Sequence, residues 1–331
     1  MLNLTASLRY FAARLVHGDS SAIAPYLREG LGIEARARKL AVHWRPHLEA
    51  SRAAQERWST ERGGRLTVLG AGRLLDFSRT LAGDFDRLRF VDADPLCTPF
   101  WRGAFPDGHE AVIDDVTGCL RDWTARLSGL KNRDLARTLD CVRSLRAPPF
   151  PAAPGWLRDS DAVLSLNLLS QIAVGWQDRV ESHLMRRFGA SFVERHEDEW
   201  LAAVKPSGRS LAEAHLTLLN GSGARRLLLI TDLLYLEYQG LERNYSRRRW
   251  EAPPVRWQDG QWRNDSASPL ECESYSALCG LDDPAALLPD YREVWRDQWL
   301  WHIRPRGTEP PAGSGSVHLV GAFAFENRRT L

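Results

Sequence analysis

The chain has 331 residues, 44% of them hydrophobic, and a formal net charge of +2. A chain of this length can bury a sizeable core, either as one large domain or as a domain with a cap. The nearly balanced charge does not support an electrostatic nucleic-acid binder, and no apolar run approaches the roughly 20 residues that a membrane span requires. We therefore expect a globular protein whose partners are neither nucleic acids nor membranes.

The cysteines are odd in number, and none belongs to a Cys-x-x-Cys pair; they are Cys97, Cys119, Cys141, Cys272 and Cys279. This pattern argues for reduced thiols and against a disulfide framework or a zinc site. The first residues also lack the charged and apolar regions of a signal peptide. Together these features predict a cytoplasmic protein.

Residues 1–62 are expected to form a helical cap ahead of a main domain over residues 63–331. Apolar residues recur there every three or four positions, at Leu4, Leu8, Phe11 and Leu15 and again at Ile33, Ala37, Leu40 and Trp44. Between them, a helix from about Ala22 to Glu29 should end at Gly30. Such a segment commonly packs over the open end of a sheet, where it covers a substrate.

Two histidines of this cap, His43 and His47, have the spacing of metal ligands on one helix face. Pro46 lies between them and no third ligand of a known pattern follows. A structural role is therefore favoured, and no metal is predicted.

The stretch Arg65–Asp94 predicts a strand, a glycine turn, a helix and a second strand, at Leu66–Leu69, Gly70–Gly72, Arg73–Ala82 and Leu88–Val91. A glycine turn between a buried strand and a helix lets a ligand approach the backbone and meet the free N–H groups of the helix. Asp92, at the end of the second strand, is placed to accept hydrogen bonds from a ribose. These features predict half of a nucleoside-cofactor site, although the two glycines also fit an ordinary tight turn.

The next two strands also end in polar residues. The strand 111–118 ends near Asp115, which is placed either to meet the amine of an adenine or to cap the following turn. The strand that begins at Asp161 leads to Asn167, Ser170 and Gln171, at the edge where open α/β sheets bind ligands.

The remaining segments complete an alternating pattern. Residues 120–158 are expected to be a helical insertion closed by a proline-rich loop, and a helix over 178–203 should break at Lys205–Gly208. The apolar strand Arg226–Asp232 precedes a polar excursion over residues 240–290. Strands at Gln298–Arg304 and Ser316–Phe325 are joined by a loop too short for a crossover helix, so they should pair antiparallel.

Five strand–helix units followed by an antiparallel pair resemble the Rossmann-like sheet of class I S-adenosylmethionine-dependent methyltransferases, over roughly residues 65–325. Within that fold, an uncharacterised bacterial group described only as methyltransferase-like is similar at Leu69-Gly70-Ala71-Gly72-x-Leu74-Leu75-Asp76, Val91-Asp92, Asp115-Val116-Thr117-Gly118, Asn167-Leu168-Leu169-Ser170-Gln171 and Trp299-x-Trp301-x-Ile303-x-Pro305. The fold expected is therefore α/β, with a mostly parallel sheet, an antiparallel C-terminal strand and an N-terminal helical cap.

The resemblance implies S-adenosylmethionine as the cofactor and a methyl acceptor that is a small molecule or a protein. Gly70 and Gly72 would line the methionine part, Asp92 would hold the ribose, Asp115 would face the adenine and Asn167 would border the methyl-transfer pocket. The full set of cofactor-binding residues expected is Gly70, Ala71, Gly72, Arg73, Asp92, Ala93, Asp115, Val116, Asn167 and Leu168.

Two departures from the family pattern leave a second function open. The position two before the first glycine is usually acidic but is Val68 here, and Arg73 follows Gly72 where a third small residue is usual. Arg73 could pair with the methionine carboxylate, or it could fill the site of a silent scaffold protein that has lost its cofactor. Dinucleotide binding ranks third, because its glycine fingerprint needs a glycine where Leu75 stands.

Methyl transfer is an in-line displacement at a sulfonium, so alignment can supply much of the catalysis without a triad or a metal. An acceptor that must lose a proton would need a general base. Asp232, Tyr235 and His215 are candidates by position, and the sequence does not choose among them.

Overall fold

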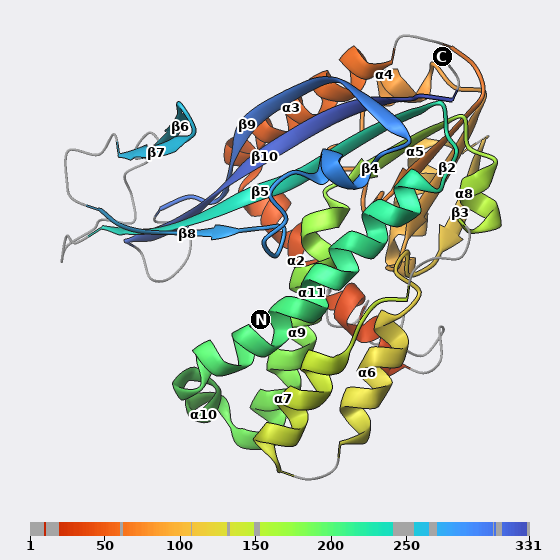
Figure 1. Ribbon diagram of the computed structural model, residues 1–331. Helices are drawn as coiled ribbons and strands as arrows, with labels where there is room; N and C mark the ends of the chain where they lie inside the picture. The colour runs from red at the N-terminus through yellow and green to blue at the C-terminus, as the bar shows by residue number, and fades with distance from the viewer. Residues whose placement is uncertain are drawn as a thin grey trace.

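The computed structural model describes residues 10, 20–59, 62–106, 108–130, 133–148, 153–240, 255–264, 270–306, 308 and 313–329. The expected helix around Leu4 to Leu15 lies outside these residues. Where the structure describes the chain, helices and strands alternate through the first two thirds and strands dominate the last third (Figure 1).

The centre of the molecule is one eight-stranded sheet, in the order β3-β2-β1-β4-β5-β10-β9, with β8 beside the outer half of β5. Its strands are β1 (Arg65–Leu69), β2 (Arg87–Asp92), β3 (His109–Ile113), β4 (Ala162–Leu166), β5 (Arg226–Gly240), β8 (Leu270–Ser276), β9 (Tyr291–Arg304) and β10 (Ser314–Asn327). Strands β1 to β5 pair parallel, whereas β10 runs antiparallel to both β5 and β9. The chain therefore has the class I methyltransferase-like fold expected, including the antiparallel pair at the C-terminus.

Each face of the sheet is buried because the inner strands are apolar on both sides. Along β5, Leu227 and Leu229 belong to one core, and Leu228 and Ile230 belong to the other. The first core lies beneath the helices that follow β4, and the second lies beneath α3 (Ala41–Trp58), which packs on β9, β10 and β5.

The helices form two unequal layers. The α3 side also carries α4 (Arg79–Ala82), η1 (Pro95–Cys97) and α5 (Thr98–Ala104). The other layer is larger and projects below the sheet in Figure 1; it contains α6 (Leu120–Gly129), α7 (Leu135–Ser144), α9 (Leu168–Phe188), α10 (Ala190–Arg195) and α11 (Glu197–Asn220). The short elements α8 (Gly155–Arg158) and η2 (Pro284–Leu287) are connections. Helix α2 (Ser20–Lys39) contacts both layers, through α3 and through α6 and α9.

Two expected helices are wrong. Helix α2 continues through Gly30 to Lys39. The expected helix over 178–203 is divided among α9, α10 and α11, and α11 continues through Pro206 to Asn220. Helix α11 stays helical at Pro206 because the surrounding turn is buried and hydrogen-bonded. The indole N–H of Trp176 donates to the Ser207 hydroxyl at 2.8 Å, and this hydroxyl donates to the Val204 carbonyl at 2.8 Å. Tertiary packing therefore outweighs the helix-breaking tendency of proline here.

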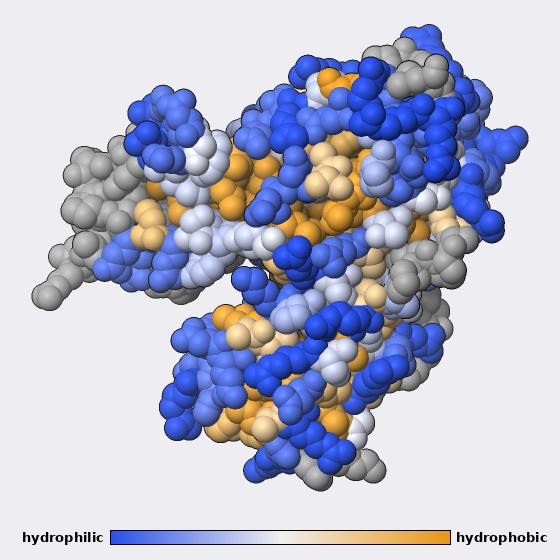
Figure 2. All heavy atoms as spheres, in the orientation of Figure 1, coloured by the Kyte–Doolittle hydropathy of each residue, from blue (hydrophilic) through white to orange (hydrophobic). Residues whose placement is uncertain are grey.

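The last third of the chain extends the sheet. Strand β5 does not end at Asp232 but continues to Gly240, because β8 and β10 supply hydrogen-bonding partners along its outer half. The excursion 240–290 contains β8, η2 and a separate hairpin of β6 (Val255–Gln258) and β7 (Gln261–Asn264). In Figure 2, a notch separates these projecting strands from the helical layer, and apolar groups gather along the middle of the molecule. Among the described residues, no helix has the length and apolar character of a membrane span.

Candidate functional site

The glycine turn lies where β1 ends, between β2 and β4. Gly70 and Gly72 both have positive φ angles, 71° and 50°. A Cβ atom on Gly70 would lie 2.8 Å from the Leu166 carbonyl oxygen and 3.0 Å from Cβ of Leu168, so this glycine is required by packing against the end of β4. A Cβ atom on Gly72 would meet no described atom closer than 3.9 Å, so the described part of the chain leaves the turn open at Gly72.

The helix expected directly after the turn is wrong. Helix α4 begins only at Arg79, where Ser78 caps it, and Leu74 adopts a positive φ of 57°. The buried Gln55 of α3 accounts for this, because its side chain accepts from Ser78 N at 2.8 Å and donates to the Asp76 carbonyl at 2.7 Å. These bonds replace helical ones, so the N-terminus of α4 does not lie at this turn.

Asp92 joins the glycine turn to the segment after β2. Its Oδ2 accepts from Gly72 N at 2.8 Å, and its Oδ1 accepts from Asp94 N at 2.8 Å. Burial raises the pKa of Asp92 to about 6, although these two bonds oppose the shift. Each carboxylate oxygen has two lone pairs, so Asp92 can still accept from a diol. Ala93 is the link between the two aspartates.

Arg73 is buried in an acidic clamp. It lies 2.7 Å from Asp94 Oδ2 and 3.2 Å from Glu34 Oε2 of α2, and its side chain is 3% exposed. Its Nη2 atom is buried and has no hydrogen-bond partner among the described residues. Gly30 of α2 lies against this clamp, where a Cβ atom would overlap Asp94 Oδ2 and Arg73 Nη1. Helix α2 thus covers the turn through a close contact that only glycine allows.

Asp115 and Val116 lie in the turn after β3. Asp115 Oδ1 accepts from the N–H and the hydroxyl of Thr117 at 3.0 and 2.7 Å, and Oδ2 accepts from Leu120 N at 3.1 Å. The carboxylate therefore caps the start of α6, the second of the two roles that the sequence left open. Val116 is buried in the core on the α9 side.

Asn167 and Leu168 stand at the start of α9, directly after β4. Asn167 is left-handed, with φ 50°, and its Nδ2 donates to Asp76 Oδ2 at 3.1 Å. Its Oδ1 is buried and has no hydrogen-bond partner in the part of the chain that the structure describes. Burial raises the pKa of Asp76 to about 6. Leu168 lies beside Gly70, so the ends of β1 and β4 meet at this point.

The three candidate bases are not equivalent. His215 lies on α11, where burial lowers its pKa to about 4 and its Nε2 is 2.9 Å from the Ser165 hydroxyl; this contact is structural. Asp232 is fully buried, and its Oδ2 accepts from Ser170 Oγ at 3.1 Å and from Gln171 Nε2 at 3.2 Å. Tyr235 lies three residues after Asp232 along β5.

Sequence reasoning missed His318 of β10, whose Nδ1 lies 3.3 Å from Asp232 Oδ1. The ring of His318 is 4.3 Å from the ring of Tyr235 and 5.4 Å from that of Trp301. The one available signal was a histidine within an otherwise apolar strand. His47, predicted to be structural, is buried against Trp301 and accepts from the Trp299 indole at 3.0 Å. The described residues contain no cluster of three potential metal ligands.

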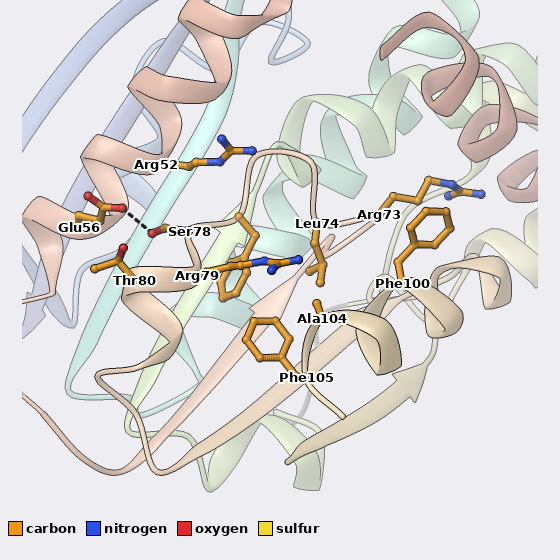
Figure 3. Close-up of a pocket in the computed structure, with 11 residues that line it drawn as sticks. Arg52, Glu56, Arg73, Leu74, Ser78, Arg79, Thr80, Phe100, Ala104 and Phe105 are labelled. Carbon is orange, nitrogen blue, oxygen red and sulfur yellow. Dashed lines mark hydrogen bonds between the residues drawn. The ribbon is translucent and has the colours of Figure 1, made fainter. Parts of the chain in front are cut away.

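A cavity of about 440 Å³ opens on the α3 side of the irregular segment after the turn (Figure 3). Its lining residues include Arg52 and Glu56 of α3, Leu74 of the segment, Arg79 of α4, and Phe100, Ala104 and Phe105 in and after α5. Figure 3 shows Arg73 turned away from the centre of this cavity, beside Phe100.

No protein-family model matches the sequence, and no curated protein matches it either. Among solved structures, the chain is similar to the N-methyltransferase NodS from Bradyrhizobium japonicum WM9 in complex with S-adenosyl-L-homocysteine, with 8% identity, 85% and 87% of the two chains covered, and a TM-score of 0.36. It is also similar to the 1,6-didemethyltoxoflavin-N1-methyltransferase of Burkholderia thailandensis, with 14% identity, 89% and 88% coverage and a TM-score of 0.32.

A similarity of the same order extends to a putative Zn-dependent alcohol dehydrogenase from Rhodobacter sphaeroides, with 12% identity, 54% and 45% coverage and a TM-score of 0.29. These matches do not bear on what this chain binds or transforms. The strand order and the contacts around the glycine turn carry the functional argument instead.

Proposed function

We propose that the chain is an S-adenosylmethionine-dependent methyltransferase, acting under the cover of α2 and α3. The observation that carries the proposal is the meeting of three features at one edge of a class I methyltransferase-like sheet. Asp92 fixes the glycine turn from the end of β2. Among the described residues, Gly72 has open space beside it and one buried guanidinium nitrogen of Arg73 has no partner.

The groups present fit the parts of this cofactor. The Nη2 of Arg73 can donate to the methionine carboxylate, because a hydrogen bond between an ionised donor and an ionised acceptor is strong. Asp92 keeps acceptor capacity for the ribose hydroxyls, and the unpartnered Oδ1 of Asn167 can accept from the methionine ammonium. Since Asp115 already caps α6, the adenine would lie beside Val116 and meet the remaining lone pairs of that carboxylate.

When bound, the cofactor supplies a methyl group on a sulfonium, and the residues of the chain have to align it with an acceptor. The turn, β2 and the start of α9 provide fixed positions, because each is held by backbone hydrogen bonds to a neighbouring strand: Gly70 N to Val91 O at 3.0 Å and Asn167 N to Ile230 O at 2.8 Å. Rigid elements of this kind favour catalysis by orientation.

A second candidate is a silent scaffold with the same fold. The ion pairs of Arg73 with Asp94 and Glu34 favour the scaffold, because the two carboxylates already neutralise the guanidinium charge that would attract the carboxylate of a cofactor. Gly30 of α2 also packs directly on the clamp. The two candidates differ in one respect: the methyltransferase must open this contact when the cofactor binds, whereas the scaffold never does.

Titration calorimetry with S-adenosylmethionine, and with NAD as the control ligand, tests the proposal on a matched pair of variants. Gly72 and Gly223 both have positive φ, 50° and 72°, and open space beside them, but only Gly72 belongs to the proposed site. Gly72→Ala and Gly223→Ala should therefore carry a similar strain of about 1 kcal/mol.

We expect the wild type and Gly223→Ala to bind S-adenosylmethionine alike, and Gly72→Ala to lose binding because its methyl group occupies the open side of the turn. Equal affinity in all three proteins would place the cofactor elsewhere. Binding of NAD alone would support a dinucleotide enzyme, and binding of neither ligand would leave the scaffold as the function.

A further inference from the structure

A buried acid–imidazole pair lies at the same edge of the sheet, beyond the glycine turn and between β5 and β10. Asp232 Oδ1 and His318 Nδ1 face each other in a polar contact of 3.3 Å. Both atoms are buried, and among the described residues neither makes a well-formed hydrogen bond. Since a buried polar group needs a partner, this contact with the carboxylate is what orients the imidazole.

A bulge in the sheet creates this pair. The pairing of β5 with β10 shifts register at Leu319 and Val320, so Leu319 pairs with Leu234 whereas Val320 pairs with Asp232. The extra residue, Leu233, brings Asp232 and Tyr235 to the same face as His318, which is the face that α3 covers. Bulges of this kind re-aim side chains and are frequent beside active sites.

His318 has one ring nitrogen left for chemistry. Its side chain is 10% exposed although Nδ1 is fully buried, so the exposure belongs to the rest of the side chain. Nε2 has no hydrogen-bond partner among the residues that the structure describes. A carboxylate on Nδ1 keeps the proton of a neutral imidazole on that nitrogen, which leaves Nε2 with a lone pair that can take a proton.

The charged and titratable groups that face His318 come from two elements. Asp232 and Tyr235 lie on β5 and His47 lies on α3. Burial lowers the pKa of His47 to about 3, so this second histidine stays neutral and does not compete for the proton. Burial alone would raise the pKa of Asp232, but His318 and its other partners hold it below the ordinary value, so Asp232 stays ionised.

We propose that His318, oriented by Asp232, is the general base that removes a proton from the methyl acceptor, and that this acceptor is a phenol. This inference rests on the proposed function. The phenolic O–H proton passes to Nε2, the oxygen lone pair forms the bond to the methyl carbon, and the electrons of the breaking carbon–sulfur bond stay on sulfur as a neutral thioether. Asp232 is a positioning residue, because it acts through His318.

A phenol fits for two reasons. Its hydroxyl, with a pKa of about 10, is within the range in which an imidazole gives effective base catalysis, whereas an aliphatic alcohol is far less acidic. The rings of Tyr235 and Trp301 stand beside His318, at 4.3 and 5.4 Å, and can pack against an aromatic acceptor.

The test does not need the acceptor to be known, because the tautomer of His318 can be read from nitrogen-15 shifts of histidine-labelled protein, with His318→Gln assigning the signal. In the wild type at about pH 8, we expect the proton on Nδ1. In Asp232→Asn, the amide oxygen must take the side where Ser170 and Gln171 donate, so the amide N–H₂ faces Nδ1. The proton should then move to Nε2.

Activity is measured in parallel as release of S-adenosylhomocysteine with p-cresol, and with propylamine for comparison. His318→Gln should lose about 100-fold or more of the phenol-dependent rate while its calorimetric affinity for S-adenosylmethionine stays unchanged. The exposed His196, which pairs with Glu199 on the helical layer, gives the matched control His196→Gln with wild-type rate.

The inference is overturned by a wild-type proton on Nε2, by an unchanged tautomer in Asp232→Asn, or by a His318→Gln variant as active as wild type. Turnover of the amine but not of the phenol by protein that binds S-adenosylmethionine would overturn the acceptor class. If calorimetry detects no S-adenosylmethionine binding to the wild type, the proposed function itself is refuted. The calorimetric result therefore distinguishes failure of the proposed function from failure of this inference.

Discussion

The two polar regions at the edge of the sheet where the parallel strands end are built differently. Around the glycine turn, Asp92 binds two backbone N–H groups and Arg73 pairs with two acids, so ion pairs and backbone contacts fix the region. Between β5 and β10, Asp232 is held by side chains, and its partner His318 keeps a ring nitrogen free. The contacts around the glycine turn fix the backbone there, whereas the contacts of His318 leave its Nε2 available for a reaction.

This difference predicts that the first region dominates stability. Arg73→Ala should lower the free energy of unfolding by about 3–5 kcal/mol, because it leaves the buried carboxylate of Asp94 without its cation and leaves Glu34 with Arg38 alone. Urea denaturation followed by circular dichroism measures the change. Arg209→Ala, which breaks an exposed pair with Glu213, is the control and should cost at most about 1 kcal/mol. Equal losses in the two variants would show that the clamp is not a stabilising centre.

Helix α2 offers a sharper test of how tightly that region is covered. Gly30→Ala should cost about 1–3 kcal/mol of unfolding free energy, because its methyl group would overlap Asp94 and Arg73. Gly32, two residues further along the same helix, has nothing within 4 Å of a Cβ atom, so Gly32→Ala should stabilise the chain slightly. Thermal denaturation of Gly30→Ala and Gly32→Ala tests this contact. If both variants are more stable than the wild type, α2 does not pack against Arg73 and Asp94 as described.

Asp76, which stands between the two regions, predicts a smaller effect that depends on pH. Burial raises its pKa from 3.8 to about 6, so the folded state holds this proton more tightly than the unfolded state does. Its contribution to the free energy of unfolding is therefore present at about pH 4 and is lost as the pH rises through about 6.

Asp76→Asn removes this titration. Relative to the variant, the wild type should lose about 2 kcal/mol of unfolding free energy between about pH 4 and about pH 7, measured by urea denaturation at each pH. The exposed Asp140 gives the control variant Asp140→Asn, which should follow the wild type at every pH. If the stability of Asp76→Asn also followed that of the wild type at every pH, the carboxyl of Asp76 would not be desolvated.

The sequence predicted the parallel strands, the glycine turn and the antiparallel C-terminal pair, because alternating apolar runs and turn residues are local signals. It did not predict the irregular segment after Gly72, whose backbone is satisfied by Gln55 from a helix that precedes the turn. It also ended β5 at Asp232, since the partners that extend this strand, β8 and β10, come later in the chain. His318 was missed for the same reason: a register shift, not a sequence motif, brings it to Asp232.

The most direct test of the account is amide hydrogen exchange, followed by mass spectrometry, with and without S-adenosylmethionine. We predict slower exchange with the ligand at Gly70–Leu74 and Asp92–Asp94, the segments proposed to bind it. Helix α2 should respond as well, since it rests on the same clamp. Protection confined to other segments, or ligand binding with no change at Gly70–Leu74, would contradict the account.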